Sequence, residues 1–527
     1  MRPPRARTRE RRPPYAGTRA PRIRHYPEPT SLIFLAAPPT WQASGTRAWQ
    51  RRTTRPRAAA SASTACPHTR APSIACSHAC AAHPPLPLSS LSFPLFFSDT
   101  SLIYFHHAND YWTSIDDTFC RLPNGKNTSI VDLWGEGAPA YGLNNSWDCS
   151  QTNQAAGCKY EDELFVEEVL ARIAAHDVST PFFLFWAPHI AHAPLEVPQA
   201  YIDKFAFIED KNRRLYAAMV NYVDGLVGRV VAALKAKGMW DNLLWVSSAD
   251  NGGPIYNSGA AGANNFPCVC LPRAAGRRGA CAAPLTPNPM PRAPSPLPSN
   301  RMRGGKMSNW QGGIRVNAYA AGGLLPAAVA GTKSEGLWAG ADIYSTFCAL
   351  AGVDPTDERA AAAGLPPVDG VNQWPFLSGA TTTSPRAEVP IGSDATEANL
   401  LQLSNATVVQ GLVRADGWKL LIGETGQNIW TGPQYPNKST SWNDVPYHCG
   451  VPSSPPDGKG GCLFNILTDP TEHDDVAADH PDIVAEMYAR LLELQATAFG
   501  PNRGKDDGTA CKNALQTWKG FWGPFLE

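Results

Sequence analysis

A strand, a long helix and a second strand follow one another between residues 182 and 249, and this succession constrains the fold most. Pro181 introduces the short run Phe182 to Ala187, which is apolar on both faces. Lys211 to Gly238 carries apolar residues at helical spacing and ends in a glycine, a typical helix stop. The run from Leu243 to Ala249 is again apolar. Two such strands joined by a helix predict a βαβ unit in a parallel sheet covered on both faces.

Polar residues follow both strands at their carboxyl ends. His192 lies in the loop from Pro188 to Pro194, and Asp250-Asn251-Gly252-Gly253 directly follows the second strand. Because the carboxyl ends of parallel strands meet at one edge of a sheet, both loops are expected at one crevice, where open α/β sheets bind ligands. Asp250 and Asn251 are hard oxygen ligands that suit calcium or magnesium, and glycines allow a tight turn beside an ion. The alternative is a plain loop, because Asp-Asn-Gly-Gly is also a good turn sequence.

A glycine-rich basic loop lies between Arg303 and Arg315 and leads into another apolar strand. Glycines let the backbone approach a ligand closely, and Lys306 or Arg315 can meet an anion. For either residue, an ordinary surface position is the alternative.

The remaining patterned sequence predicts two parts. Glu161 to Asp177 has the spacing of an amphipathic helix, and a further helix is expected from Trp338 to Gly352. After residue 400 the pattern becomes antiparallel, with an expected hairpin, a strand and a closing helix: Val408 to Val413 with Trp418 to Ile422, Cys462 to Ile466, and Pro481 to Leu494. We therefore predict an α/β domain over residues 99–400 and a small C-terminal α+β subdomain over residues 401–527.

Two tracts differ in composition from the rest. Residues 1–98 contain many arginines, no lysine, and only Glu10 and Glu28 as acids, and residues 268–301 contain no Asp, Glu or Lys. Neither tract has the apolar periodicity needed to offset its conformational entropy, so both are predicted to be disordered. We interpret them as spurious translated sequence. An organelle transit peptide or a basic arm for nucleic acid are the alternatives for the first tract.

Charge and cysteine content limit the partners and the compartment. Lys+Arg and Asp+Glu are equal at 46 each, which favours neither nucleic acid nor a membrane surface. No run approaches the roughly 18 apolar residues of a membrane-spanning helix. Cysteines outside the two tracts and four N-glycosylation sequons, at Asn127, Asn144, Asn405 and Asn437, favour a secretory, oxidising compartment, although no clear signal peptide is present. Cys449 and Cys462 flank a loop and can pair, but the sequence does not fix the connectivity or the oligomeric state.

Several motifs in one order together resemble the sulfatase family, and within it the arylsulfatase B group. They cover roughly Tyr104 to Leu494 and are as follows: Phe182 to Pro198, Asp210-Lys211-Asn212-Arg213, Ser248 to Gly253, Arg303 to Arg315, Val368-Asp369-Gly370, and Phe464 to Asp475. The resemblance implies an alkaline-phosphatase-like α/β fold with a mixed, mostly parallel sheet flanked by helices. It also implies hydrolysis of an aryl sulfate or a sulfated glycan.

In that family a cysteine is converted to formylglycine, and a bound calcium or magnesium ion holds the nucleophile and the sulfate oxygens. Asp250 and Asn251 match two of the metal ligands, His192 matches a sulfate-contacting histidine, and Lys306 matches a lysine that bridges sulfate and nucleophile. These residue types suit the chemistry, because a cation, a lysine and a protonated histidine stabilise the charge of a sulfate ester in the transition state.

The sequence also departs from the family pattern. Relatives open with a strand that carries two consecutive aspartates, followed by a Cys-x-Pro-x-Arg signature and then a Gly-Lys-x-x-x-Gly loop with another lysine and a histidine, and none of these motifs is present. Cys66-Pro67-His68-Thr69-Arg70 has the right residues in the wrong order. The expectation is half a metal site, no matching formylglycine cysteine, and no turnover of sulfate esters by the chain as written.

Three other functions stay open at this stage. One is a phosphate-ester hydrolase of the same superfamily. The second is a non-catalytic relative that binds sulfated glycans through His192, Lys306 and Arg315. The third is nucleic-acid binding by the basic arm.

Overall fold

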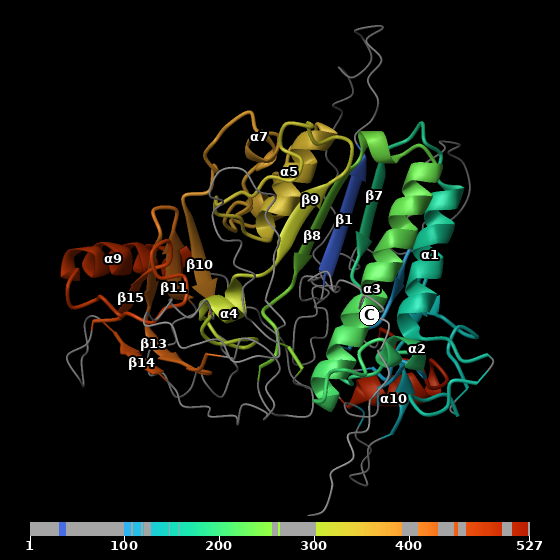
Figure 1. Ribbon diagram of the computed structural model, residues 1–527. Helices are drawn as coiled ribbons and strands as arrows, with labels where there is room; N and C mark the ends of the chain where they lie inside the picture. Colours follow the sequence, from blue (N-terminus) through green and yellow to red (C-terminus); the bar gives the residue numbers. More distant parts are fainter. Residues whose placement is uncertain are drawn as a thin grey trace, which may run out of the picture.

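The computed structural model describes residues 31–37, 100–106, 109–116, 120, 128–146, 148–155, 157–255, 262–263, 302–392, 409–430, 447–451, 460–497 and 508–524. The described parts form an α/β layer structure and a C-terminal subdomain at one end of it (Figure 1). Residues 268–301, Cys66 to Arg70, and the sequons at Asn127, Asn405 and Asn437 lie outside the described residues.

The central sheet has four strands in the order β7-β1-β8-β9. They are β7 (Phe182–Trp186), β1 (Ser31–Ala37), β8 (Leu244–Ala249) and β9 (Ala318–Ala321). β1 is antiparallel to both neighbours, with Phe34 opposite Phe185 of β7 and Val246 of β8. β9 is also antiparallel to β8.

Two sequence predictions are wrong here. Residues 31–37 form a strand, although they lie in the tract predicted to be disordered. The prediction rested on the composition of the whole tract, which one short apolar run hardly changes. The sheet is not mostly parallel, since each strand pair in the described part of the chain is antiparallel. The prediction assumed that β7 and β8 were neighbours, whereas β1 separates them. Both are antiparallel to β1, so they still run in the same direction and still end at the same edge of the sheet.

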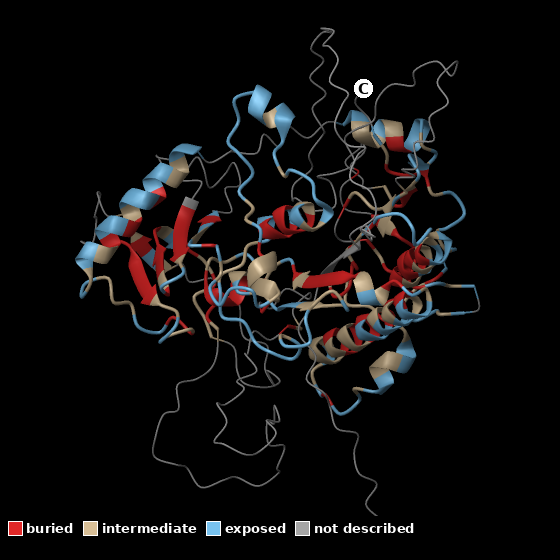
Figure 2. Ribbon diagram, turned by 90° about the horizontal axis from the view of Figure 1, so that it is seen from above, coloured by how far each residue is buried: buried red, intermediate tan, exposed pale blue. Residues whose placement is uncertain are grey.

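Helices cover both faces of this sheet, as expected for an α/β protein (Figures 1 and 2). α1 (Glu161–Ala175) and α3 (Lys211–Ala236) lie on one face, and α5 (Ala341–Ala351) lies on the other. Alternate side chains of β8 pack against the helices on opposite faces of the sheet. Trp245 packs in the cluster of α1 and α3, whereas Leu244 and Val246 pack against Ile343 and Phe347 of α5. The three predicted helices are therefore confirmed to within a few residues.

α3 is also the one helix in the described part of the chain that is long and apolar enough to cross a bilayer. Its apolar stripe packs in the largest core cluster, with Met219, Val230 and Leu234 completely buried. This packing is that of a core helix.

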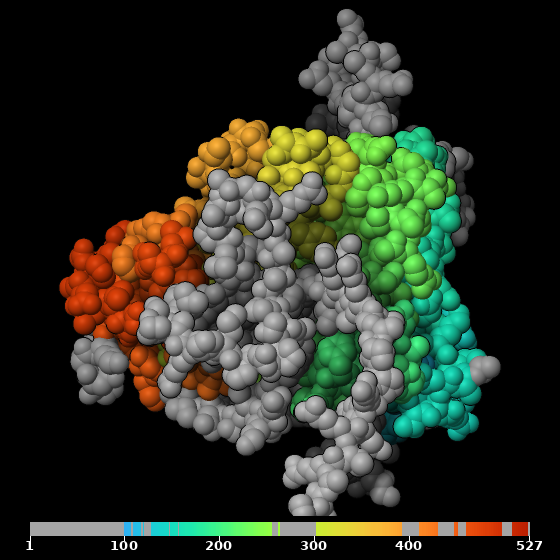
Figure 3. Space-filling view, in the orientation of Figure 1, coloured from blue at the N-terminus to red at the C-terminus, as the bar shows by residue number. Residues whose placement is uncertain are grey.

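The C-terminal subdomain is antiparallel, as predicted, with the strand order β10-β11-β12-β15. The strands are β10 (Glu388–Gly392), β11 (Val409–Arg414), β12 (Trp418–Leu421) and β15 (Cys462–Asn465). The closing helix α9 (Pro481–Thr497) packs Val484, Met487 and Leu491 on the sheet. Between β12 and β15 the chain also forms a short two-stranded ribbon of β13 (Gly423–Thr425) and β14 (Tyr447–Gly450). Cys449 of β14 is bonded to Cys462, which confirms that pair. Figure 3 shows these elements at one end of the molecule and α1 and α3 at the other.

The beginning and the end of the described domain pack together. β2 (Leu102–Ile103) pairs with β5 (Trp134–Gly135), which also pairs with β6 (Ala138–Pro139), and β3 (Ile115–Asp116) pairs with β4 (Ile130–Val131). α10 (Thr509–Gln516) lies against this region, where Cys511 is bonded to Cys120. Trp522 Nε1 donates to Asp116 Oδ2 at 3.1 Å. A second disulfide of the same region joins Cys149 and Cys158.

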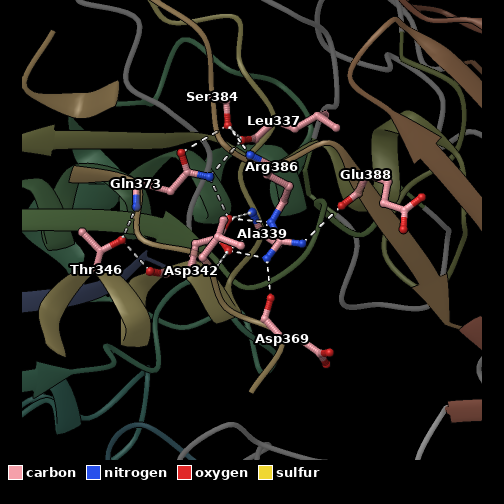
Figure 4. A network of polar contacts seen from close by, with 10 residues as sticks. Leu337, Ala339, Asp342, Thr346, Asp369, Gln373, Ser384, Arg386 and Glu388 are labelled. Atoms are coloured by element: carbon pink, nitrogen blue, oxygen red, sulfur yellow. Dashed lines mark hydrogen bonds and ion pairs between the residues drawn. The ribbon is translucent and has the colours of Figure 1, made fainter. Parts of the chain in front are cut away.

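A buried ion pair joins α5 to the start of the C-terminal subdomain (Figure 4). Arg386 Nε donates to both carboxylate oxygens of Asp342, at 3.0 and 2.8 Å, and Arg386 Nη2 donates to the carbonyl oxygen of Asp369 at 2.7 Å. Gln373 Nε2 and the backbone N–H of Ala339 donate to the same carboxylate. Burial alone would raise the pKa of Asp342, but these hydrogen bonds lower it below its ordinary value.

We predict that Arg386→Met destabilises the fold by about 3–5 kcal/mol, because it leaves the buried Asp342 carboxylate without its cation. The measurement is the free energy of unfolding in urea. Arg490→Met is the matched control, since Arg490 is half exposed and pairs with Glu388 and Glu493 at the surface. The control should cost less than about 1 kcal/mol. Equal effects of the two substitutions would contradict the role of the buried pair.

Candidate functional site

The loops that follow β7 and β8 meet at one edge of the sheet, as the sequence predicted. His192 lies in the loop after β7, and Lys306 lies in the glycine-rich loop that reaches the same edge. Lys306 Nζ and His192 Nε2 are 3.0 Å apart, although the residues are 114 positions apart in the chain. Both side chains are partly buried. The structure therefore brings together the two residues predicted to contact an anion.

The second ring nitrogen of His192 fixes the roles in this contact. His192 Nδ1 is 2.9 Å from the carbonyl oxygen of Ala193, which can only accept a hydrogen bond. Nδ1 therefore carries the proton, and Nε2 accepts a hydrogen bond from the Lys306 ammonium. An ammonium has three N–H donors, so Lys306 keeps two for an anion. Burial lowers the pKa of Lys306, and the neighbouring Asp250 carboxylate opposes that shift.

Glycines at the contact between the two loops allow the loop that carries Lys306 to reach the end of β8. The backbone N–H of Gly252 donates to the carbonyl oxygen of Gly313 at 2.9 Å, and the N–H of Lys306 donates to the carbonyl oxygen of Gly253 at 3.1 Å. A Cβ atom on Gly252 would overlap the carbonyl oxygen of Gly312. Gly252 was expected to allow a tight turn beside an ion, whereas in the structure it permits the close approach of two loops.

Asp250 and Asn251 directly follow the carboxyl end of β8, and the Asp250 carboxylate interacts electrostatically with Lys306. Asp250 is exposed to solvent, yet the protein around its carboxylate raises its pKa, and Lys306 opposes the shift. A calcium ion takes about six to eight oxygen ligands. Two residues would supply only part of such a shell, and the described residues contain no cluster of three or more His, Cys, Asp or Glu suited to a metal ion. The described set is therefore not a complete metal site.

Arg315, the other cation proposed for this loop, is directed elsewhere. It is exposed, and its guanidinium lies 4.0 Å from the Glu335 carboxylate on the surface. Only Lys306 of the two candidates contacts His192.

Buried acids behind the His192 loop were not predicted as part of the site. Glu161 and Asp162 begin α1 and are completely buried. The backbone N–H of His189 donates to Asp162 Oδ1 at 3.1 Å, and His189 Nδ1 lies 3.8 Å from Glu161 Oε2. Burial raises the pKa of Asp162 to about 7, although His189 opposes the shift. The sequence places these acids in the first turn of a helix, where acids are favoured at an exposed surface, so nothing in it indicated burial.

The loop that carries Lys306 is anchored by a second unpredicted group. The Arg303 guanidinium lies 3.6 Å from the ring centre of Trp310 and 4.4 Å from that of Tyr447, and is almost completely buried. Arg303 Nη1 also donates to the carbonyl oxygen of Glu472 at 3.0 Å. The Glu472 carboxylate pairs with Lys419, which is also completely buried. Arg303 and Glu472 were both in the motifs that carried the family resemblance, but no role was predicted for them.

Comparisons with known proteins support the same family. The family model described as Sulfatase matches residues 47–353. Arylsulfatase J of Mus musculus is 28% identical over 380 residues, covering 70% of this chain and 54% of the relative. N-acetylgalactosamine-6-sulfatase of Homo sapiens is 26% identical over 216 residues, covering 41% of this chain and 32% of the relative. The chain thus spans about half, or less, of the length of these relatives.

One solved structure in the comparison is that of Ps i-CgsB in complex with k-i-k-neocarrahexaose. It is 22% identical, covers 80% of this chain and 71% of that chain, and has a TM-score of 0.49.

We predict that the Asp162 carboxyl makes folding stability depend on pH. An acid with a raised pKa in the folded state contributes stability that is fully present below its unfolded pKa of about 3.9 and is lost as the pH rises through about 7. Asp162→Asn keeps an oxygen acceptor for the His189 N–H and carries no charge. Relative to the wild type, the variant should therefore gain on the order of 2 kcal/mol between pH 5 and pH 8.

The measurement is urea unfolding at both pH values. Asp241→Asn is the control, because Asp241 is exposed. This substitution should leave the pH dependence of the unfolding free energy unchanged. If Asp162→Asn and Asp241→Asn give the same pH dependence, the buried carboxyl does not contribute it.

Proposed function

The chain belongs to the sulfatase family, and we propose that its His192–Lys306 pair binds the sulfate group of a sulfate ester. Sulfuric ester hydrolysis is the reaction of the family and of the named relatives. The observation that carries the proposal is the 3.0 Å contact between Lys306 Nζ and His192 Nε2 at the edge of the sheet. This contact leaves a partly buried ammonium with two N–H donors for an anion.

The chemistry of a sulfate ester suits this pair. The ester carries its negative charge on the oxygens bound to sulfur, and a buried ammonium forms charge-assisted hydrogen bonds to such oxygens. When His192 is protonated it can no longer accept from Lys306, so it becomes a second donor to the anion.

We propose binding without turnover for the sequence as printed. A Cys-x-Pro-x-Arg signature that would supply the nucleophile of the family is not found in it. Members of the family generally depend on a divalent metal ion. Calcium is the ion that we expect here, and magnesium is the alternative. Asp250 and Asn251 would contribute two oxygen ligands to such an ion, and we derive no step through it because the described ligand set is incomplete.

A sulfated sugar is the ester that we favour. One relative is named as a sulfatase of N-acetylgalactosamine-6-sulfate, which supports a sulfated glycan as the ligand class. The three disulfides among the described residues support a secretory, oxidising compartment, as the sequence predicted.

Removal of the Lys306 ammonium is predicted to weaken the binding of inorganic sulfate by about 10- to 100-fold, the usual effect of losing a hydrogen bond to a charged group. The measurement is isothermal titration calorimetry of wild type and Lys306→Ala. The matched control is Lys333→Ala, because Lys333 is an exposed lysine of the same domain. Equal affinity of wild type and Lys306→Ala would rule out Lys306 as the anion donor.

No hydrolysis is expected when the full chain is assayed with 4-nitrophenyl sulfate in the presence of calcium or magnesium, because no nucleophile is assigned. The assay measures released 4-nitrophenol, with 4-nitrophenyl phosphate in parallel. Sulfate-ester turnover that disappears in Lys306→Ala would show that the chain contains a nucleophile that the sequence analysis missed. Turnover of the phosphate ester alone would favour the phosphate-ester hydrolase instead.

A further inference from the structure

The hydroxyl of Tyr111 lies inside the turn that carries His192. Tyr111 Oη is 3.0 Å from the carbonyl oxygen of His189, 3.1 Å from that of His192, and 3.1 Å from the backbone nitrogen of His192. Tyr111 is completely buried and comes from a segment about 80 residues earlier in the chain. One side chain therefore contacts both ends of the turn from residue 189 to residue 192.

The donors and acceptors of this hydroxyl can be assigned. A phenol has one proton to donate and can also accept. Only the backbone N–H of His192 can donate to it, so the hydroxyl accepts there and donates to one of the two carbonyl oxygens. Burial raises the pKa of Tyr111 well above its ordinary value, so the proton stays on the hydroxyl at working pH.

The ring of Tyr111 stacks on two other rings, which restricts the position of its hydroxyl. It stacks on the His189 ring with centroids 4.3 Å apart and planes 19° apart. It also stacks on the Tyr160 ring, with centroids 5.0 Å apart and planes 5° apart. Such stacked, fully buried rings leave the hydroxyl little freedom to move away from the turn.

We propose that Tyr111 is a positioning residue that sets the orientation of His192. Through the His192 ring it also sets the position of the Lys306 ammonium. The series of contacts runs from Tyr111 Oη to the His192 backbone, and from His192 Nε2 to Lys306 Nζ. The consequence for anion binding rests on the proposed function, whereas the restraint on His192 does not. Without the hydroxyl, the His192 N–H keeps the longer bond to the His189 carbonyl, at 3.2 Å.

The test compares Tyr111→Phe with Tyr160→Phe. Both substitutions remove one buried hydroxyl and keep the ring of the same stack. The Tyr160 hydroxyl donates to the carbonyl oxygen of Glu196 at 2.8 Å and does not contact the turn at His192. Melting temperatures of both variants control for general loss of stability.

The first readout is the rate at which diethylpyrocarbonate modifies His192, followed by peptide mass spectrometry with the exposed His448 as internal reference. We expect the rate at His192 to rise about 5-fold in Tyr111→Phe, because the ring leaves Lys306 more often once a hydrogen bond is lost. The rate should stay as in the wild type in Tyr160→Phe. Equal rates in the two variants overturn the proposal.

The second readout is the affinity for inorganic sulfate, which should fall in Tyr111→Phe and not in Tyr160→Phe. If wild type binds no sulfate, the proposed function fails, while the modification rates still test the restraint on His192. If both variants lose affinity equally, the stack as a whole matters and the specific role of the Tyr111 hydroxyl is overturned.

A further measurement covers the case in which Tyr111→Phe does not fold. Amide hydrogen exchange of the peptide that contains residues 189–193 is compared between wild type and Lys306→Ala. Protection retained in Lys306→Ala supports a turn held by Tyr111 independently of the lysine. Protection lost in that variant shows that Lys306 holds the turn, and overturns the proposal.

Discussion

The close approach of two backbone segments is the constraint on which the candidate site depends. The turn after β8 and the loop from Arg303 to Arg315 touch main chain to main chain, and this is possible only because Gly252 has no side chain. The contact brings the Lys306 ammonium to the sheet edge at which the loop after β7 also ends. A larger residue at Gly252 would push the loop of Lys306 away from the turn after β8, and with it the Lys306 ammonium away from His192, although it would touch neither side chain.

Each member of the pair is held by a different part of the chain. The turn of His192 is restrained by Tyr111, in the segment before α1, and by the acids that begin α1. The loop of Lys306 is anchored through Arg303 to Glu472 and Lys419 of the C-terminal subdomain. The C-terminal subdomain therefore belongs to the site even though it contributes neither of the two side chains. Buried charges of this kind are costly to leave unpaired, which makes the anchoring specific in its geometry.

Sequence periodicity predicted where the helices and strands lie in the chain better than it predicted which strands pair with one another. The stripes of α1, α3 and α5 and the apolar runs of β7 and β8 were sufficient to locate these elements. Strand pairing is a long-range property, so β1 between β7 and β8 could not be inferred from local pattern. His192 and Lys306 were found through residue chemistry and family resemblance. Tyr111, Glu161 and Arg303 were missed, because an isolated tyrosine occurs both inside and at the surface of proteins, whereas a helix-starting acid and a loop arginine are usually exposed, and only burial reveals their roles.

The disulfide between Cys120 and Cys511 turns almost the entire folded chain into a covalent ring, since its sequence separation is 391 residues. The strands β7, β8 and β9, the loop of Lys306 and the C-terminal sheet with α9 lie inside that ring, and so does the tract from residue 268 to residue 301, whereas β1 lies outside it. A single backbone cut within the ring therefore leaves one molecule under oxidising conditions and two fragments only after reduction. In an oxidising compartment, an internal cut would therefore nick the chain without releasing the part that carries His192 or the part that carries Lys306.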